Sequence, residues 1–124
     1  YEHYLASRGI EDAVTLYPPV DDMNAWYENI DILLHPGMKE TFCYAVAEAM
    51  AKGISVVVNE FYGSRAIWPT YILYSTHHHA INKILQIQDN IFGYNMANIS
   101  ARLYIKKEYG LERQLQETDE FIGL

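Results

Sequence analysis

The sequence is poor in cysteine and in basic residues. Cys43 is the single cysteine among 124 residues, so the chain holds no internal disulfide, as is typical of a reducing compartment. Lysine and arginine together number 9 against 16 aspartates and glutamates, which gives a net charge of −7. Because nucleic-acid binding depends on basic side chains that neutralise phosphates, this balance argues against a DNA- or RNA-binding protein.

Long hydrophobic runs are also missing. No stretch approaches the roughly 18 apolar residues of a transmembrane helix, and no signal peptide opens the chain. We therefore expect a cytoplasmic protein with no transmembrane segment, peripheral at the membrane if it meets one at all. Residues 1–10 look like the tail of a helix stopped by Gly9, so we also expect a piece of a longer protein.

Residues 31–59 contain the clearest structural pattern. Two short apolar runs, 32–34 and 56–58, flank a segment of helix formers at 42–52. Unalternating runs of this length are typical of strands covered on both faces, and a helix-length link is what a parallel pair requires. The pattern predicts a strand–helix–strand unit of an α/β fold, a Rossmann-like parallel sheet flanked by helices.

The flanking sequence predicts further elements. Residues 13–17 have the composition of a strand closed by two prolines, and Asp21 or Asp22 is placed to cap the next helix. Residues 71–74 predict a short strand, and Thr76 begins a helix. The apolar residues expected on the buried side of that helix are Ile81, Ile84, Leu85 and Ile87.

The last third of the chain predicts helices only. The apolar stripe of the first, which stops near Gly110, consists of Phe92, Met96, Ile99 and Leu103. The apolar side of the final helix, which begins at Leu111, includes Leu115 and Ile122. We interpret residues 1–124 as one domain with a C-terminal helical extension at 91–124. Its stripes read as core or packing surface, and where they are exposed they favour self-association.

The loops after the two central strands hold the candidate site, because ligands of open parallel sheets bind outside the carboxyl ends of the strands. Gly37 allows a tight turn, Thr41 can cap the helix, and the first-turn amides then form an anion site. Glu40 lies before this helix and Glu48 two turns inside it. Both carboxylates can therefore accept hydrogen bonds from the hydroxyls of one ligand.

At this point the residues resemble a known family. Glu40 and Glu48 form an E-x7-E pattern, followed directly by Ala49-Met50-Ala51-Lys52-Gly53 and the valines at 56–57. This stretch resembles the donor-site motif of the retaining glycosyltransferases of family four, which have the GT-B fold. Residues 67–69, Ile-Trp-Pro, resemble a subgroup of polysaccharide and surface-glycan enzymes. Three positions depart from the family pattern, namely Cys43 for glycine, Gly37 for serine and Ser55 for proline.

The resemblance implies a role for each matched position. Glu40 would be the catalytic residue that approaches the hydroxyls of the donor sugar, Glu48 would hold the ribose hydroxyls, and the amides of residues 42–44 would meet the diphosphate. The remaining donor-site residues would come from the same loop and helix start, at Gly37, Lys39, Thr41, Phe42, Cys43 and Tyr44.

The resemblance also implies a reaction. A sugar would pass from a nucleotide-sugar to a glycan or lipid-linked acceptor with retention of anomeric configuration, without a metal or other cofactor. The acceptor-binding domain and the basic residues that neutralise the diphosphate would precede Tyr1, so this part alone would be inactive. Two other classes stay open. One is a catalytically inactive nucleotide-sugar-binding or scaffold module that partners an active transferase, and the other is a flavodoxin-like nucleotide-binding protein.

Single residues have alternatives too. Glu48 can pair with Lys52 one turn on, and Glu40 and its neighbour Lys39 can be ordinary solvated loop residues. Cys43 with His35 suggests a cysteine nucleophile and its base, or simply a small buried side chain. The histidines at 77–79 suggest a metal site, but successive positions point in different directions, which favours a solvated helix start.

Overall fold

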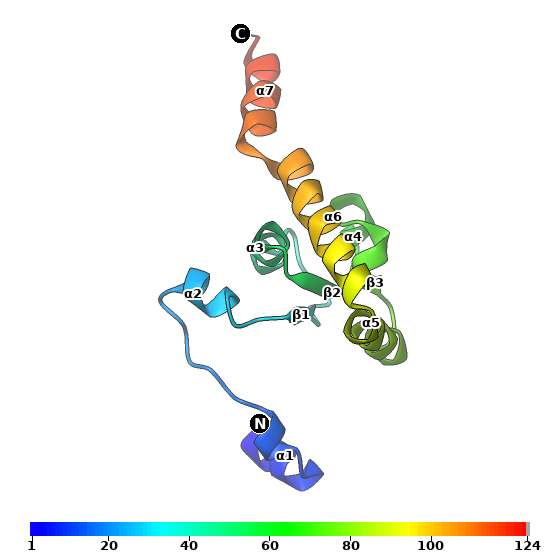
Figure 1. The fold of residues 1–124 in the computed structure, drawn as a ribbon. Coiled ribbons are helices and arrows are strands. Elements are labelled where there is room, and N and C mark those ends of the chain that lie inside the picture. The colour runs from blue at the N-terminus through cyan, green and yellow to red at the C-terminus, as the bar shows by residue number, and fades with distance from the viewer. Residues whose placement is uncertain (124) are drawn as a thin grey trace.

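The computed structural model describes residues 1–123 and shows an α/β fold built on a three-stranded parallel sheet (Figure 1). The N-terminal elements are α1 (Glu2–Arg8), η1 (Glu11–Ala13), α2 (Met23–Tyr27), β1 (Ile32–His35), α3 (Tyr44–Lys52) and β2 (Ser55–Asn59). The C-terminal elements are α4 (Ser64–Ile67), η2 (Thr70–Ile72), β3 (Leu73–Tyr74), α5 (His77–Asp89), α6 (Ile91–Tyr109) and α7 (Leu111–Ile122). The predicted strand–helix–strand unit and Rossmann-like sheet are confirmed.

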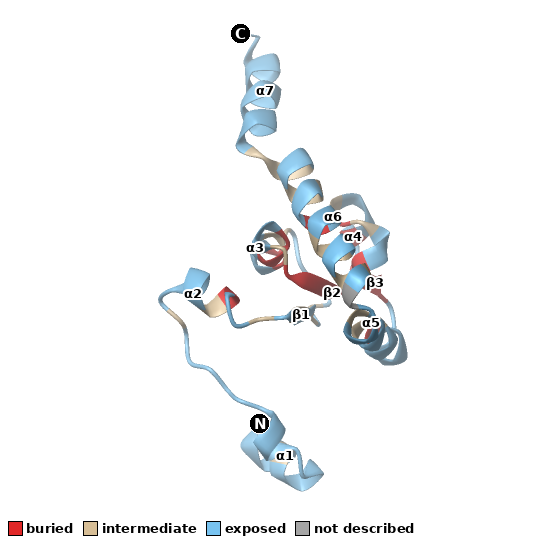
Figure 2. Cartoon of the chain, viewed as in Figure 1, coloured by how far each residue is buried: buried red, intermediate tan, exposed pale blue. Residues whose placement is uncertain are grey.

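β2 is the central strand, and helices cover both of its faces. It pairs with β1 from Ile32 opposite Ser55 onward, and with β3 through Val58 opposite Leu73. Because side chains alternate along a strand, Val56 and Val58 pack in the core cluster that includes α3 and α6, whereas Val57 packs with Ala80 of α5. Figure 2 shows the buried residues concentrated in this layer, with α1 and α7 exposed.

The sequence of α3 explains why it forms a buried helix. Val46, Ala49 and Met50 are spaced as one helical face, and each is 0% exposed. Gly53 ends the helix in the left-handed conformation, with φ 79°. The last carbonyls of α3 are satisfied from α6, since the Arg102 guanidinium donates to Lys52 O at 2.8 Å and to Ala51 O at 3.1 Å. This contact ties α6 to the end of α3.

Two predictions are wrong, one about a strand at residues 13–17 and one about the start of α3. The segment 13–17 is not a strand, and Leu16 and Tyr17 are 54% and 66% exposed. β1 is the edge of the described sheet, and Pro18 and Pro19 lack the amide donors that a neighbouring strand would need. α3 begins at Tyr44 rather than Phe42, so Thr41 does not cap it.

The smaller predictions for α2 and α5 mostly hold. Asp22 accepts a hydrogen bond from Ala25 N at 3.1 Å, and Thr76 accepts one from His79 N at 3.2 Å, so both are N-caps. The short strand predicted at 71–74 is present as β3. On α5 the burial prediction is half right. Ala80 is buried and Ile84 and Ile87 pack beside it, but the exposed residues include Ile81 and Leu85.

The apolar stripe of α6 faces solvent, which corrects its interpretation as core. Its four members are between 50% and 78% exposed, namely Phe92, Met96, Ile99 and Leu103. The inward side instead carries the small Ala101 and polar groups that bond the body. The Tyr94 hydroxyl donates to Asp31 O at 2.9 Å, and the Ser55 hydroxyl donates to the Asn98 side-chain oxygen. Apolar periodicity alone therefore predicts the wrong side of α6 to be buried.

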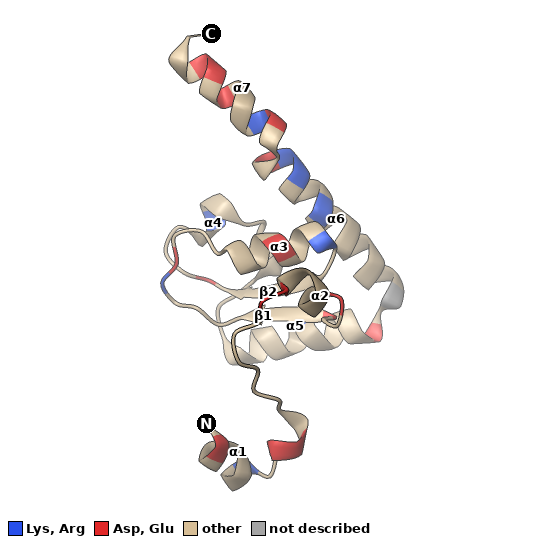
Figure 3. Cartoon of the chain, turned by 90° about the vertical axis from the view of Figure 1, so that its left-hand side faces the viewer, with Lys and Arg blue, Asp and Glu red and all other residues tan. Residues whose placement is uncertain are grey.

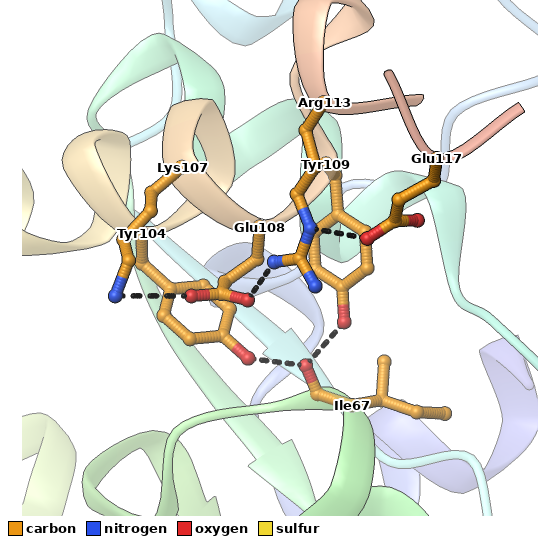
Figure 4. Close-up of polar contacts among 7 residues, drawn as sticks. All are labelled: Ile67, Tyr104, Lys107, Glu108, Tyr109, Arg113 and Glu117. Atoms are coloured by element: carbon orange, nitrogen blue, oxygen red, sulfur yellow. Dashed lines mark hydrogen bonds and ion pairs between the residues drawn. The ribbon is translucent and has the colours of Figure 1, made fainter. Parts of the chain in front are cut away.

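The junction of α6 and α7 is fixed to the last residue of α4 (Figure 4). The hydroxyls of Tyr104 and Tyr109 both donate to the Ile67 carbonyl, each at 2.7 Å. Burial and the neighbouring Tyr109 raise the pKa of Tyr104 to about 12. On the outer side Arg113 of α7 pairs with Glu108 and with Glu117, the latter at 2.7 Å.

Removing both tyrosine hydroxyls is expected to cost more than the two single losses together. Tyr104→Phe or Tyr109→Phe alone leaves the Ile67 carbonyl one donor, so each costs about 0.5–1 kcal/mol of unfolding free energy. The double variant leaves that carbonyl unsatisfied and exceeds the sum by roughly 1 kcal/mol, measured by urea unfolding. Tyr94→Phe, which removes a hydroxyl that bonds elsewhere, is the control and should add to Tyr104→Phe without coupling. Simple additivity of Tyr104→Phe and Tyr109→Phe contradicts the shared-acceptor geometry.

Candidate functional site

The site lies at the carboxyl ends of β1 and β2, where two loops meet. Residues 36–43 connect β1 to α3, and residues 60–63 connect β2 to α4. The Asn59 side-chain amide donates to Gly37 O at 3.4 Å and so links the two loops. This is the edge at which the sequence predicts the ligand to bind.

The first loop is organised by a compact contact of His35 and Glu40. His35 Nε2 lies 3.4 Å from Glu40 Oε1, and His35 Nδ1 is buried without a hydrogen-bond partner. A Cβ at position 37 would collide with His35 Cε1 and lie 3.0 Å from Glu40 Oε1. Glycine is needed there for space, because Gly37 is not among the residues with positive φ. The sequence predicts that Gly37 is needed for a tight turn. The structure shows instead that Gly37 is needed because the side chains of His35 and Glu40 approach its backbone closely.

Glu48 is the second carboxylate of the predicted pair, and α2 holds it in place. The Tyr27 hydroxyl lies 3.1 Å from Glu48 Oε2 and 3.3 Å from Ala45 O, so its proton is shared between them. Tyr27 is only 3% exposed, whereas Glu48 lies at the surface. Burial, followed by the hydrogen bond and charge of Glu48, raises the pKa of Tyr27 to about 12. Glu48 is thus an exposed carboxylate with a fixed orientation.

The alternative that Glu48 pairs with Lys52 is not what the structure shows. Lys52 Nζ instead donates to Asn24 O of α2 at 3.4 Å. The helix α2 therefore contacts α3 at two points, through Tyr27 and through this carbonyl. No spacing rule points to Tyr27, which lies far upstream in the sequence and which sequence reasoning did not connect with the site.

Glu48 stands between two surface hollows. One, of about 400 Å³, lies between α2 and α3 and is lined by Asp21, Asp22, Met23, Asn24, Tyr27, Glu48, Ala51 and Lys52. The other, of about 440 Å³, lies between α3 and the α6–α7 junction and is lined by Phe42, Tyr44, Ala47, Glu48, Ala51, Ile105, Tyr109 and Gln114. Phe42, Tyr44 and Glu48 of the predicted donor site thus share one hollow. Glu40 lines neither, because it turns toward His35.

A comparison of the whole chain with known protein families gives the context of this geometry. The family described as Glycosyl transferases group 1 matches residues 1–89. The chain belongs to this family. A GDP-mannose-dependent alpha-mannosyltransferase of Mycolicibacterium smegmatis (strain ATCC 700084 / mc(2)155) is 46% identical over 41 residues, which are 33% of this chain and 11% of that protein. The chain thus spans a small part of the relative's length. No solved structure matches the chain.

Cys43, just before α3, points into the core of this glycosyltransferase domain. Cys43 is 8% exposed and packs in the main core, with extended backbone angles at the N-cap. Its thiol is therefore inside the domain, and the imidazole of His35 faces Glu40, which argues against a cysteine–histidine nucleophile pair. The first backbone bond of α3 runs from Val46 N to Cys43 O, so the preceding amides stand at the open end of the helix.

An aromatic cluster explains the late start of α3. The ring of Phe42 lies 5.1 Å from that of Trp68 and 5.0 Å from that of Tyr109, measured between centroids. Because Phe42 is held by these contacts, the loop stays extended through Cys43, and the helix begins at Tyr44, two residues later than predicted. Tyr44 is exposed and stacks edge-on against Phe42 at 5.2 Å. Lys39 and Thr41 are exposed on the same loop.

The remaining candidates are surface features. The histidines at 77–79 are exposed at the start of α5, as the solvated-helix interpretation predicts. Within residues 1–123 no three histidine, cysteine or acidic side chains are placed to hold a metal ion. In the same range no helix is both long and apolar enough to cross a membrane.

The Tyr27–Glu48 bond should make stability fall at high pH. Tyr27 has a folded-state pKa of about 12 against an ordinary 10.0, so its contribution is complete below pH 10 and is lost as the pH rises toward 12. We expect the unfolding free energy of the native chain to fall more steeply between pH 10 and 12 than that of Tyr27→Phe. Glu48→Gln should lower the pKa of Tyr27, read from its ring carbon by NMR. An unchanged Tyr27 pKa in Glu48→Gln contradicts the contact.

Gly37→Ala should destabilise the domain by about 1 kcal/mol, because the added methyl displaces the His35 ring and separates it from Glu40. The measurement is chemical denaturation together with the NMR signals of the His35 imidazole. In a His35→Ala background the same Gly37→Ala change has no ring to displace and should cost much less. Equal costs in both backgrounds would show that the steric argument is wrong.

Proposed function

We propose that this glycosyltransferase domain binds the donor of a sugar transfer, a nucleoside diphosphate sugar, at the start of α3. The observation that carries the proposal is Glu48, an exposed carboxylate oriented by the buried hydroxyl of Tyr27. Tyr27 occupies one oxygen of Glu48, and the other oxygen keeps its lone pairs for the two hydroxyls of a ribose. A carboxylate already held in place loses little conformational freedom when a ligand binds.

The open end of α3 supports the diphosphate part of the proposal. Backbone amides at a helix start attract phosphate oxygens and favour the negative charge that develops on a leaving diphosphate. In the proposed arrangement these amides act at residues 42–44, beside the exposed Lys39, with no metal ion. The domain has a net charge of −7, so further basic residues that neutralise the diphosphate would come from a part of the protein beyond this chain. The acceptor site would lie in that part too.

Glu40 is proposed as the residue nearest the transferred sugar. It lies on the β1–α3 loop, ahead of the helix start, and its contact with His35 keeps the carboxylate at the edge of the sheet. A carboxylate there can accept hydrogen bonds from sugar hydroxyls while the diphosphate lies against α3. We propose transfer with retention to a glycan or lipid-linked acceptor, in polysaccharide or surface-glycan synthesis at the cytoplasmic side of a membrane.

The base of the donor is proposed from the relative rather than from the site. That relative is described as GDP-mannose-dependent, so a guanosine diphosphate sugar is the first donor to test. The hollow beside Glu48 includes Tyr44 and Tyr109, whose rings offer a surface for a nucleobase to stack on.

Ligand-observed NMR with GDP, UDP and ADP tests the proposal directly. One diphosphate, with GDP expected, should show saturation transfer with the native chain, and Glu48→Ala should weaken its binding by at least about tenfold because the ribose contacts are lost. Tyr27→Phe should weaken it less, because the carboxylate remains but is no longer oriented. Glu2→Ala, an exposed glutamate on α1, is the matched control and should bind as the native chain does.

The outcomes separate clearly. Nucleotide binding that survives Glu48→Ala unchanged would exclude Glu48 as the ribose ligand. No binding of any of the three nucleotides by the native chain would count against a donor site formed by these residues. Binding without sugar transfer by the full-length protein would indicate the non-catalytic module instead.

A further inference from the structure

A third hollow, of about 220 Å³, lies at the amino end of β2, away from the carboxyl edge that holds the candidate donor site. Its lining comes from four elements, namely β2, η2, α5 and α6. The two helices contact each other and the same central strand (Figure 1). None of the lining residues also lines the hollows beside Glu48, so this hollow is a separate feature of the domain.

The hollow exists because two of its walls are incomplete. β3 pairs with only the last two residues of β2, so residues 55–57 extend beyond its end. Val56 and Val57 both line the hollow, although successive side chains of a strand point to opposite faces, so the hollow reaches the edge of β2 itself. On the other wall α6 presents Ala97 and Ala101, which lie four residues apart on one side of the helix. Their small side chains leave the space unfilled.

The inner part of the hollow is apolar and buried. Val56, Val57, Ile72 and Ala101 all line it and are between 1% and 5% exposed. Such a lining favours an apolar group over water, and an engineered apolar cavity of about 150 Å³ binds benzene. The volume of about 220 Å³ therefore suits a ring of that size with one small substituent.

The polar residues of the hollow are more exposed than its floor. Tyr71 is 48% exposed, Gln86 is exposed and Lys83 is half-buried. Lys83 Nζ donates to Tyr71 O at 2.5 Å, which leaves two of its three hydrogens for another acceptor. Gln86 lies three residues on, on the same side of α5, and adds a side-chain amide. The outer part of the hollow can therefore hold a polar group of a ligand whose apolar part lies inside.

The charge of Lys83 determines which polar group fits. Among the described residues that line the hollow it is the only charged one, and no ion pair within residues 1–123 includes it. The other charged residue of α5 is Asp89, six residues on and so on a different side; Figure 3 shows most of this helix uncharged.

An anion would restore what the ammonium loses on burial. Burial lowers the pKa of Lys83, because part of the water around its charge is excluded, and a bound anion favours the charged form again. The domain has a net charge of −7, which repels a dianion such as phosphate more strongly than a monoanion. One lysine in an acidic domain therefore suits a carboxylate.

We propose that the hollow between β2, α5 and α6 binds a small apolar molecule with one carboxylate, of about the size of benzoate. The apolar part lies against β2 and Ala97, and the carboxylate accepts hydrogen bonds from Lys83. This site shares no lining residue with the hollows beside Glu48, so the proposal does not depend on the donor site.

Titration of the native chain with benzoate, followed by the backbone amide signals in NMR, tests the site. Saturable shifts are expected at residues 55–57, 83–87 and 97–101, with the millimolar dissociation constant of a fragment this small. Lys83→Met should weaken benzoate binding by at least about fivefold but leave binding of the neutral analogue benzamide unchanged, because only the charge is lost. Lys106→Met, at an exposed lysine of α6 outside the hollow, is the matched control and should bind benzoate as the native chain does.

A second variant tests the space rather than the charge. Ala97→Leu places a larger side chain in the hollow and should weaken binding of benzoate and benzamide alike by at least about tenfold. Ala6→Leu, at an exposed alanine of α1, is its control, and circular dichroism checks that each variant is folded. The proposal is overturned if benzoate causes no saturable shifts at the lining residues of the native chain. It is equally overturned if Lys83→Met binds benzoate as tightly as Lys106→Met does, or if folded Ala97→Leu binds both molecules as the native chain does.

Discussion

Burial of β2 between helices is the constraint on which the rest of the domain depends. Its three valines are 5%, 1% and 0% exposed, and they alternate between the cluster formed with α3 and α6 and the cluster formed with α5. Because α3 must present Val46, Ala49 and Met50 to this layer, its rotation about its own axis is fixed. That rotation leaves Glu48 at the surface. Because α3 connects the parallel strands β1 and β2, its start lies at the carboxyl edge of the sheet. The position of the candidate donor site thus follows from the packing of the core and the parallel connection.

The part of the fold that the sequence predicts well is local. The strand–helix–strand unit can be identified because its apolar runs, its helix formers and Gly53 all lie within about 30 residues and agree with one another. The caps at Asp22 and Thr76 are predictable for the same reason, since a cap needs only its own helix. The family motif adds Glu40 and Glu48, but the motif does not tell how either carboxylate is held.

The features that the sequence does not reveal depend on distant contacts. Tyr27 reaches Glu48 from another helix, and Phe42 delays the start of α3 only because Trp68 and Tyr109 enclose its ring. The apolar stripe of α6 wrongly predicts the buried side of that helix. The side that faces the body is held by hydroxyl, amide and guanidinium groups, and hydrophobic periodicity does not detect buried polar groups. The segment 13–17 has strand composition, yet composition does not supply the neighbouring strand that would accept its hydrogen bonds.

The position of α7 connects the C-terminal helices to the candidate donor site. Gln114 of α7 and Tyr109 at the end of α6 line the same hollow as Phe42, Tyr44 and Glu48. Tyr109 is anchored to the Ile67 carbonyl, whereas the ion pairs of Arg113 join α7 to Glu108 of α6 and to its own Glu117. One wall of the hollow is therefore anchored to α4, and the other is formed by a helix whose apolar residues Leu111, Leu115 and Ile122 are exposed. Any contact that fixes α7 also fixes the shape of the hollow beside Glu48.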